Sequence, residues 1–568
     1  MSLPPSFSTL FVCAIFLTPL SAQVGGHFEK IYGWAGQAEG DNFGWTISDA
    51  GDVNGDGFDD VIIGSPHASR GFGIPPGRVY VYSGATGDLL WSWVITDQYN
   101  TLFGYSVSSA GDVNGDGYPD IVVGAPDASG SGLSHAGAVV VYSGLTGAQL
   151  LRIDGATVDS RLGRSVSGAG DVNQDGFDDI IAGASGVSSG GYYNNGAVFV
   201  YSGKDGTCLY EWNGQGDHEL LGNQVSDLGD INLDGHADVL VGSYRASPGG
   251  QRYAGSVYVY SGLDGSTLFQ WDGDQMSDYF GSSVANAGDI DGDGFADIAI
   301  SSVYDFSARG VAVIYSGRTG QELFHEIGSD VPFYNFGRAI EGAGDVNGDG
   351  FDDFLIGISP GQFPSPYFGA ARLYSGASHE ILQSWESDEP IDQLGASFGG
   401  GGDIDGDGLS DILLPAARAD FAGLEDVGIV RAVGFRPGIQ SNVSTFSASA
   451  GELVSIQVDL PTEASGYIYK VIFSASGPGQ MFSGIPIPLF EDSMVHRNYF
   501  GIYPFEQSFN LHGILNQNGD AIATILIAPN EFEAHLTGRT FYMAAVASST
   551  GLKPAEFSSV ALQLDILP

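Results

Sequence analysis

The chain has 568 residues, 87 of them glycine, and its 43% hydrophobic and 12% aromatic content excludes an intrinsically disordered protein. Its length exceeds what one hydrophobic core supports, so several domains or a repeat array are needed. The formal net charge of −48, from 68 acidic and 20 basic residues, argues against nucleic acid and anionic membranes as partners, because phosphates are bound by Lys and Arg.

Residues 1–22 have the organisation of a secretory signal peptide. An apolar stretch over 7–20 leads to Ser21 and Ala22, which suit cleavage. The n-region has no Lys or Arg, so an uncleaved anchor is the alternative, although the apolar run is short and broken by a proline. We expect a protein that is secreted and extracellular, at the cell surface or periplasmic, with no transmembrane segment. After cleavage Cys208 is the only cysteine, so an internal disulfide is impossible.

An acidic motif recurs seven times, at intervals of 56 to 60 residues. The first copy is Gly-Asp-Val-Asn-Gly-Asp-Gly at 51–57. The first aspartates of the seven copies are Asp52, Asp112, Asp171, Asp230, Asp289, Asp345 and Asp403. Each copy follows a Phe-Gly or Leu-Gly pair, and precedes an apolar run such as VIIGSP at 61–66. In the first six units a segment ending in Tyr-Ser-Gly comes next, such as RVYVYSG at 78–84.

Each unit is predicted to form four strands of about five residues, because apolar runs alternate with turn residues and no helical period is present. Seven such units favour an all-β, seven-bladed β-propeller over 28–436. A solenoid is the alternative, but it needs polar capping repeats, and none is visible. The seventh unit lacks its Tyr-Ser-Gly and fourth strand, whereas 27–44 matches the pattern at 209–222. Residues 28–33 are therefore expected to supply the outer strand of the last blade and to close the ring.

The acidic motif has the ligand spacing of a calcium loop. Counted from its first aspartate, it offers side-chain oxygens at positions 1, 3, 5 and 9, a carbonyl at position 7 and a turning glycine at position 6. Asp, Asn and Gly also favour plain turns, but several carboxylates in one loop repel each other without a cation. We predict up to seven Ca²⁺; Mg²⁺ is less suited, because it prefers rigid octahedral sites and keeps its waters. The expected ligands are Asp52, Asn54, Asp56, Phe58 and Asp60; Asp112, Asn114, Asp116, Tyr118 and Asp120; Asp171, Asn173, Asp175, Phe177 and Asp179; Asp230, Asn232, Asp234, His236 and Asp238; Asp289, Asp291, Asp293, Phe295 and Asp297; Asp345, Asn347, Asp349, Phe351 and Asp353; and Asp403, Asp405, Asp407, Leu409 and Asp411.

Phe-Gly pairs, the Gly-Ala-Pro at 124–126 and Asp-rich loops in units near 60 residues resemble FG-GAP repeats, the building block of the integrin α-chain head. The resemblance covers roughly 28–436, although Gly-Ala-Pro is intact only in the second unit. It implies that the ions are mainly structural and brace the loop between the first two strands of a blade. It also implies that partners bind on the face opposite the calcium loops.

That opposite face is expected to consist of the loops between second and third strands, which vary in length. Examples are 66–77, 185–196, 244–255 and 359–369. The candidate ligand contacts in them are Tyr192, Tyr193, Tyr253, Phe363, Tyr367 and Phe368. Exposed aromatic residues commonly dominate binding; the alternative is that they pack against neighbouring loops.

Residues 439–568 carry no acidic loops and are predicted to form a β-sandwich-like domain. Hydrophobic alternation indicates strands at 454–460 and 560–567, and further strands are expected at 467–473 and 521–527. The end of the chain resembles C-terminal modules of secreted repeat proteins from planctomycete-like bacteria. This resemblance implies no known activity.

Together these features predict a calcium-binding adhesion or ligand-binding module, with an extracellular protein or glycan as its ligand. A carbohydrate-binding lectin-like protein and a polysaccharide-active enzyme are the alternatives. No catalytic set breaks the repeat symmetry, so an enzyme is not expected. Gly395-Ala-Ser397-Phe-Gly399 has the spacing of a nucleophile elbow, but Ser106 and Ser165 hold the same place in other units, which indicates a strand.

Overall fold

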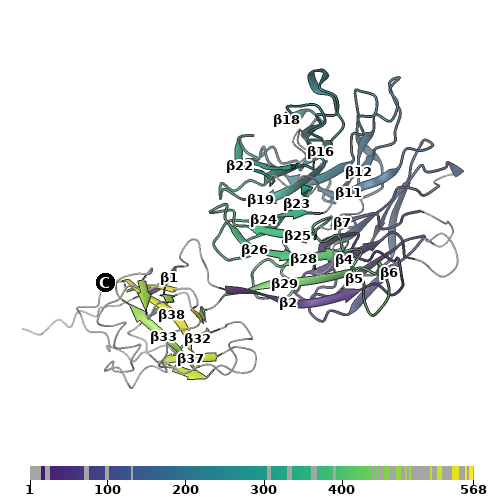
Figure 1. Cartoon of the computed structure of the whole chain (residues 1–568). Coiled ribbons are helices and arrows are strands. Elements are labelled where there is room, and N and C mark those ends of the chain that lie inside the picture. Colours follow the sequence, from purple (N-terminus) through teal and green to yellow (C-terminus); the bar gives the residue numbers. More distant parts are fainter. Residues whose placement is uncertain are drawn as a thin grey trace, which may run out of the picture. The chain divides into compact units, whose positions relative to one another are not determined.

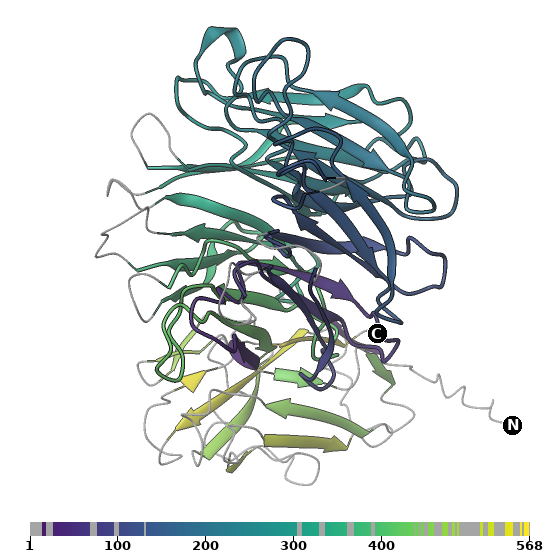
Figure 2. The ribbon, with the colours of Figure 1, turned by 90° about the vertical axis from the view of Figure 1, so that its right-hand side faces the viewer.

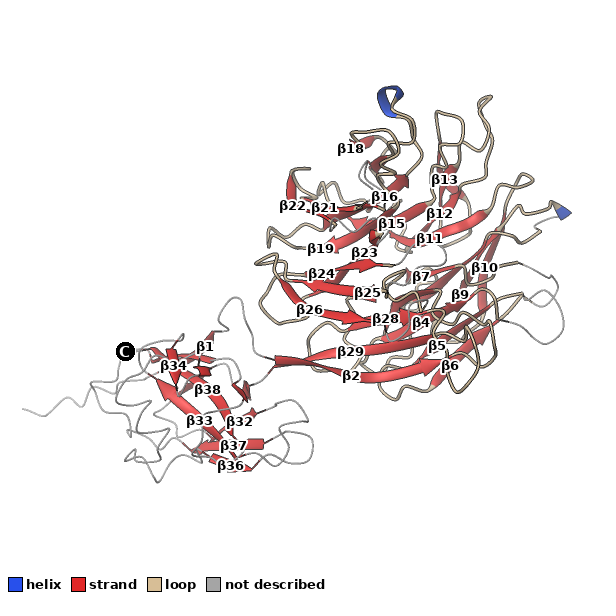
Figure 3. Ribbon diagram, in the orientation of Figure 1, coloured by secondary structure: helices blue, strands red, loops and turns tan. Residues whose placement is uncertain are grey.

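The computed structural model describes residues 26–68, 76–95, 101–129, 132–303, 309–328, 335–359, 368–387 and 392–437, and the backbone of separate strands at 14–18 and within 439–566. Regular structure is mostly strand, as Figure 3 shows, with short helical turns such as η2 (Pro248–Gly250). Among the described residues, no helix has the length and apolar character that a membrane crossing requires. The chain divides into two units, Lys30–Val346 with Gly350–Gly434, and Met1–Glu29 with Asn347–Asp349 and Phe435–Pro568.

The described residues form seven antiparallel four-stranded sheets, the blades of a propeller (Figure 1). The blades follow one another in chain order, from purple to green in Figure 2. This architecture confirms the predicted all-β, seven-bladed propeller. The first three blades are β3 (Thr46–Gly51), β4 (Asp60–Ser65), β5 (Arg78–Tyr82) and β6 (Leu89–Trp93); β7 (Ser106–Gly111), β8 (Asp120–Ala125), β9 (Ala138–Tyr142) and β10 (Gln149–Asp154); and β11 (Leu162–Gly170), β12 (Asp179–Ala184), β13 (Ala197–Tyr201) and β14 (Cys208–Asn213). The next three are β15 (Gln224–Gly229), β16 (Asp238–Ser243), β17 (Ser256–Tyr260) and β18 (Thr267–Asp272); β19 (Ser283–Gly288), β20 (Asp297–Ser302), β21 (Val311–Tyr315) and β22 (Glu322–Ile327); and β23 (Phe336–Gly344), β24 (Asp353–Ile358), β25 (Ala370–Tyr374) and β26 (Ile381–Glu386).

Burial falls from the second strand of a blade to its outermost strand. All six residues of β4 and of β8 are buried, because these strands lie between the neighbouring blades. The outer strands β6 and β14 are half exposed. Continuous apolar runs such as VIIG therefore mark second strands, and mixed segments such as LYEW mark outer ones.

The Phe-Gly pair of one blade meets the apolar run of the preceding blade. Phe103 is fully buried, and Gly104 has a φ of 83°, a conformation that favours glycine. A Cβ atom on Gly64 would lie 2.3 Å from the carbonyl oxygen of Gly104. Both glycines are needed, because the backbones of two blades approach each other directly at this joint.

Aromatic side chains join the outer parts of adjacent blades. The ring of Trp93 stacks on Tyr142 of the next blade with a centroid distance of 4.4 Å, and its Nε1 donates a hydrogen bond of 2.9 Å to the Gly147 carbonyl. Trp212 repeats this with Tyr260, also at 4.4 Å, and donates to Gly265 at 3.0 Å. The turn after Tyr-Ser-Gly thus accepts a hydrogen bond from a tryptophan of the preceding blade.

The last blade combines both ends of the propeller. Its sheet has the order β2 (Gly26–Ala35), β29 (Ile429–Pro437), β28 (Ile412–Ala416) and β27 (Gly399–Gly400), so residues 28–33 lie in its outer strand. Figure 1 labels β2 beside β29. The ring of Trp34 in β2 packs on Tyr82 of the first blade in a tilted contact with a centroid distance of 5.2 Å, and its Nε1 donates to the Gly87 carbonyl at 2.9 Å. The joint between the last and first blades is therefore built like the others.

The C-terminal part contains strands that overlap all four predicted segments. A three-stranded sheet has the order β30-β32-β37, and a second sheet has the order β31-β1-β40-β38-β33-β36, with β39 beside β38. Strand β1 lies inside the predicted signal peptide, so cleavage would remove it from between β31 and β40. Signal cleavage and the β-sandwich stay predictions. The strands are β1 (Ala14–Thr18), β30 (Ile439–Ser441), β31 (Thr445–Ser447), β32 (Leu453–Val458), β33 (Ile468–Ser474), β34 (Gln480–Phe482), β35 (Ile485–Ile487), β36 (His512–Ile514), β37 (Ala521–Leu526), β38 (Thr540–Ser548), β39 (Phe557–Ser558) and β40 (Leu562–Ile566).

Candidate functional site

Each acidic loop connects the first and second strands of a blade, and its first aspartate organises it. In the first loop, Oδ1 of Asp52 accepts hydrogen bonds from the amides of Gly55 and Asp56, at 2.7 and 3.0 Å. Its Oδ2 accepts from Gly57 at 2.8 Å. Gly57, at position 6, has a φ of 90°. The position-1 carboxylate and the turning glycine thus curl the loop around one centre, as a calcium loop requires.

The position-9 aspartate is the buried member of each loop. Asp60 is fully buried, and its carboxylate accepts from the amides of Val53 and Gly84, at 3.1 and 3.0 Å. Gly84 is the last residue of Tyr-Ser-Gly, a link that the sequence analysis missed although the motif was visible. Burial, and then the charges of Asp56 and Asp52, raise the pKa of Asp60 to about 7.

Burial likewise raises the position-9 pKa in other loops. A neighbouring cation would favour the charged form of such a carboxyl. The values are about 7 for Asp120, Asp179 and Asp297, about 6 for Asp238 and about 8 for Asp411.

Position 3 separates two kinds of loop. In the fifth loop, one ligand atom from each of Asp289, Asp291 and Asp297 lies within 4.8 Å of the others, a spacing that suits a metal ion. Asp403, Asp405 and Asp411 form the same arrangement in the seventh loop. The other loops have Asn at position 3, and the amides of Asn54, Asn114, Asn173 and Asn232 donate to the position-9 carboxylates.

The donor set fits a hard cation. Oδ1 of Asn173 is buried and accepts no hydrogen bond, so it is an oxygen without a protein partner inside the third loop. All side-chain ligands in the seven loops are oxygens, which Ca²⁺ prefers.

An aspartate at position 8 ties neighbouring loops together. The spacing within one repeat gives no sign of this link. Oδ2 of Asp178 accepts a hydrogen bond of 2.8 Å from the amide of Asp112 in the preceding blade, and the Asp178 amide donates to the Asp112 carbonyl at 3.2 Å. Asp352 makes the same pair of bonds to Asp289, at 2.7 and 3.1 Å. Burial raises the pKa of both position-8 carboxyls. Where position 8 is Asp, as in the first, third and sixth loops, it therefore holds position 1 of the preceding loop.

The position-7 side chains add a second link between loops. A Cβ on Gly55 would lie 2.6 Å from the Tyr118 ring, so this ring packs directly against the preceding loop. Phe177 packs in the same way against Gly115. His236 was assigned only a carbonyl role, but its Nδ1 also lies 2.6 Å from the Val172 carbonyl oxygen. The position-7 and position-8 side chains thus join the metal loops of consecutive blades at several joints.

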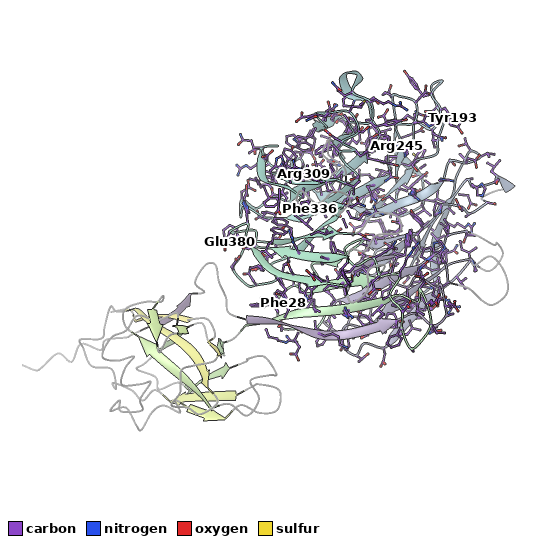
Figure 4. All side chains as sticks on the ribbon, viewed as in Figure 1. Phe28, Tyr193, Arg245, Arg309, Phe336 and Glu380 are labelled. Carbon is purple, nitrogen blue, oxygen red and sulfur yellow. The ribbon has the colours of Figure 1, made fainter. Side chains whose placement is uncertain are left out.

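The predicted ligand-face aromatics divide into exposed and packed side chains. Tyr192, Tyr193 and Phe368 are exposed, and Tyr193 is labelled at the margin of the ribbon in Figure 4. Tyr253 instead stacks on Tyr279 with a centroid distance of 6.1 Å. This contact corresponds to the alternative, in which the aromatic residue packs against a neighbouring loop. Phe363 and Tyr367, and parts of the loops 66–77 and 359–369, lie outside the described residues.

A cavity of about 1680 Å³ runs along the inner strands. The hydroxyl oxygens of Ser106 and Ser165 accept hydrogen bonds from the inner strand of the next blade, which accounts for this serine position without catalysis. Asp227 and Glu341 also line the cavity. Burial, and then the charge of Asp227, raise the pKa of Glu341 to about 8.

Comparison with known proteins agrees with this geometry. The family model of the FG-GAP repeat matches residues 43–89, 103–142, 162–201, 223–260 and 280–310, which fall in the first five blades. The chain is 30% identical to integrin alpha-V of Gallus gallus over 228 residues, 36% of this chain and 21% of the relative. It is 31% identical to integrin alpha-5 of Xenopus laevis over 238 residues, 39% and 22% of the two chains, and 32% identical to integrin alpha-4 of the same species over 261 residues, 43% and 24%. The matched region thus spans less than a quarter of each relative.

Proposed function

Because the chain carries an FG-GAP propeller of the integrin α type, we propose that it is an extracellular adhesion or ligand-binding module. In this proposal the metal loops hold the ring together, and the opposite face contacts the ligand. The observation that carries it is the use of the loops: positions 1 and 9 are engaged in hydrogen bonds within the loops, and positions 7 and 8 join neighbouring blades in several of them. This division of labour is what the integrin resemblance implies.

The loops are proposed to bind calcium, at up to seven sites. Support comes from oxygen-only donors, from the two clusters of three carboxylates and from buried position-9 aspartates whose pKa is raised. A cation that binds the native state alone stabilises it by about 2.7 kcal/mol per site at a hundredfold excess over Kd. Without disulfides, such sites would supply much of the stability that a secreted protein needs.

The proposed location is outside the cytoplasm, as a secreted or cell-surface protein. The supporting features are the apolar N-terminal stretch with its small residues at 21–22 and the similarity to integrin α chains. The ligand is proposed to be an extracellular protein or glycan, because the strongly negative surface disfavours nucleic acid.

A binding screen with a paired variant tests this function. The calcium-loaded protein is applied to arrays of extracellular proteins and glycans, beside a Tyr192→Ala/Tyr193→Ala variant of equal melting temperature. Both tyrosines are exposed, so the variant is expected to fold and to lose affinity for a ligand contacted by their loop.

The opposite pattern would refute the assignment of faces. That pattern is a ligand whose binding is lost in a folded metal-loop variant such as Asp112→Ala, whereas the tyrosine variant still binds it. Silence of the folded, calcium-loaded protein on every array would refute the proposed function itself.

A further inference from the structure

The mouth of the central cavity, at the end opposite the metal loops, collects positive charge. Each inner strand runs from its Phe-Gly or Leu-Gly pair toward its metal loop, so the residues just after that pair lie at the far end. Arg164 and Arg338 hold this position in the third and sixth blades, and Arg418 follows β28 in the seventh. All three line the cavity. The chain has only 20 basic residues against 68 acidic ones, so three arginines in one cavity stand out.

Aromatic side chains lie beside the arginines at this mouth of the cavity. The guanidinium carbon of Arg164 lies 4.4 Å from the ring centroid of Tyr105. The Tyr105 ring is 5.8 Å from Trp45, and Trp45 is 5.5 Å from His67. Trp45 and Tyr105 are only half buried and line the cavity. Blades one to three thus present a row of flat rings that ends in a cation.

Two polar atoms of residues at the mouth have no hydrogen-bond partner in the protein. Within the described part of the chain, neither Arg164, Arg338 nor Arg418 forms a salt bridge. Nε of Arg418 is buried without a hydrogen-bond partner. Asn335 also lines the cavity, is 7% exposed, and its buried Oδ1 accepts no hydrogen bond. Buried polar atoms are normally paired, so an unpaired donor and an unpaired acceptor in one cavity indicate a ligand that supplies both partners.

The deeper part of the cavity restricts where an anion can sit. Asp49, Asp227 and Glu341 line it three or four residues further along their inner strands, roughly 10 Å from the mouth at the rise of a strand. These carboxyls offer an anion at depth no positive partner, whether or not they are ionised. An anionic ligand would therefore remain at the mouth, beside the arginines and the rings.

We propose that this mouth binds a uronic acid residue of an acidic polysaccharide. Arginine pairs with carboxylates through two parallel hydrogen bonds, and flat rings pack against the face of a sugar. Rotation of the Asn335 side chain toward the cavity would let its unpaired Oδ1 accept a sugar hydroxyl. An acidic peptide offers carboxylates and backbone amides, but no flat, hydroxyl-bearing ring for Trp45 and Tyr105. This inference rests on the proposed ligand-binding function and names the ligand class and the site.

Isothermal titration of the full, calcium-loaded protein tests the proposal with three probes: an oligogalacturonate, a neutral galactose oligomer of the same length, and a glutamate-rich peptide. The variants are Arg164→Gln, Arg418→Gln and the double variant. Arg161→Gln is the matched control, because Arg161 is exposed, stands three residues from Arg164 and does not line the cavity. A melting curve in calcium verifies that each variant is folded.

Binding of the oligogalacturonate alone is expected. Each single variant should weaken it about tenfold, the loss typical of one hydrogen bond to a charged group, and the double variant should weaken it further. Arg161→Gln should bind like the wild type. Preference for the peptide, or oligogalacturonate binding that survives the double variant, would overturn the uronic acid assignment. No binding of the oligogalacturonate, with a different ligand found on the arrays, would overturn this inference and leave the proposed function standing.

Discussion

Asp59 and Asp403 are 344 residues apart in the sequence and share two hydrogen bonds in the structure. The amide of Asp403 donates to Oδ2 of Asp59 at 2.8 Å, and the amide of Asp59 donates to the Asp403 carbonyl at 3.1 Å. The same two bonds link Asp178 with Asp112 inside the ring. The last and first metal loops are therefore joined in the same way as two consecutive ones.

Substitution of Asp59 by Ala should weaken this closing joint. The partly buried amide of Asp403 would lose its acceptor, which costs about 1 kcal/mol in the free energy of unfolding. Denaturant unfolding in calcium measures the loss. Asp88→Ala serves as the control, because Asp88 is an exposed aspartate near the same joint. Equal stability of the two variants would mean that the Asp59–Asp403 bonds do not hold the ring closed.

Trp34→Ala should detach the outer strand of the last blade. It removes the packing on Tyr82 and the hydrogen bond to Gly87, and loss of a large buried side chain costs about 3–5 kcal/mol. Trp212→Ala removes the equivalent contacts at an internal joint and should destabilise by a similar amount.

Only Trp34→Ala should also form oligomers. Strand β2 is linked to the other strands of the propeller only through the chain that follows it, so it can leave the last blade and expose the edge of β29. Light scattering of both variants separates the two effects. A Trp34→Ala protein as stable and monomeric as the wild type would contradict closure through β2.

Asp291→Asn should change stability in opposite directions with and without calcium. The substitution converts the fifth loop to the Asn-containing type and removes one of three clustered carboxylates. In excess chelator the melting temperature should rise, because repulsion among Asp289, Asp291 and Asp297 decreases. In saturating calcium the melting temperature should fall below that of the wild type, because one charged ligand is lost. A shift of the same sign in both conditions would argue against a cation in this loop.

Glu341 should make the wild type less stable as pH rises. Its pKa is raised from 4.5 to about 8 by burial and then by Asp227. Between these two values the folded protein binds a proton that the unfolded chain has released, so its contribution to stability is complete below about pH 4.5 and is lost as pH rises toward 8. Glu341→Gln removes this dependence.

The difference in melting temperature, Glu341→Gln minus wild type, is therefore expected to increase from pH 5 to pH 8. Calcium is kept constant across the series, so that the metal loops contribute equally to both proteins. A difference that stays constant over this range would show that Glu341 ionises normally.

The repeat pattern predicted the blades, the loop between first and second strands and the outer strand from 28–33, because each depends on local spacing within a unit. It did not reveal position 8, since the partner of Asp178 lies in the preceding blade. Similarly, the role of Gly84 toward Asp60 depends on how the third strand returns to the metal loop. Contacts between units require the ring geometry.

The opposite face was predictable only in part. Tyr192 and Tyr253 have the same character in the sequence, yet one is exposed and the other stacks on Tyr279. Arg164, Arg338 and Arg418 stand in three different blades, and no sequence motif unites them. They converge because the start of an inner strand and the end of a second strand lie at the same end of the closed ring.

The melting curve of the full protein in excess chelator tests the central claim most directly, namely that cations in the metal loops hold the propeller together. Loss of several sites, each contributing about 2.7 kcal/mol at a hundredfold excess over Kd, should lower the melting temperature by many degrees. Added Ca²⁺ should restore it, and Mg²⁺ should restore it poorly. A melting curve that is unchanged after removal of all bound metal, verified by elemental analysis, would contradict the account.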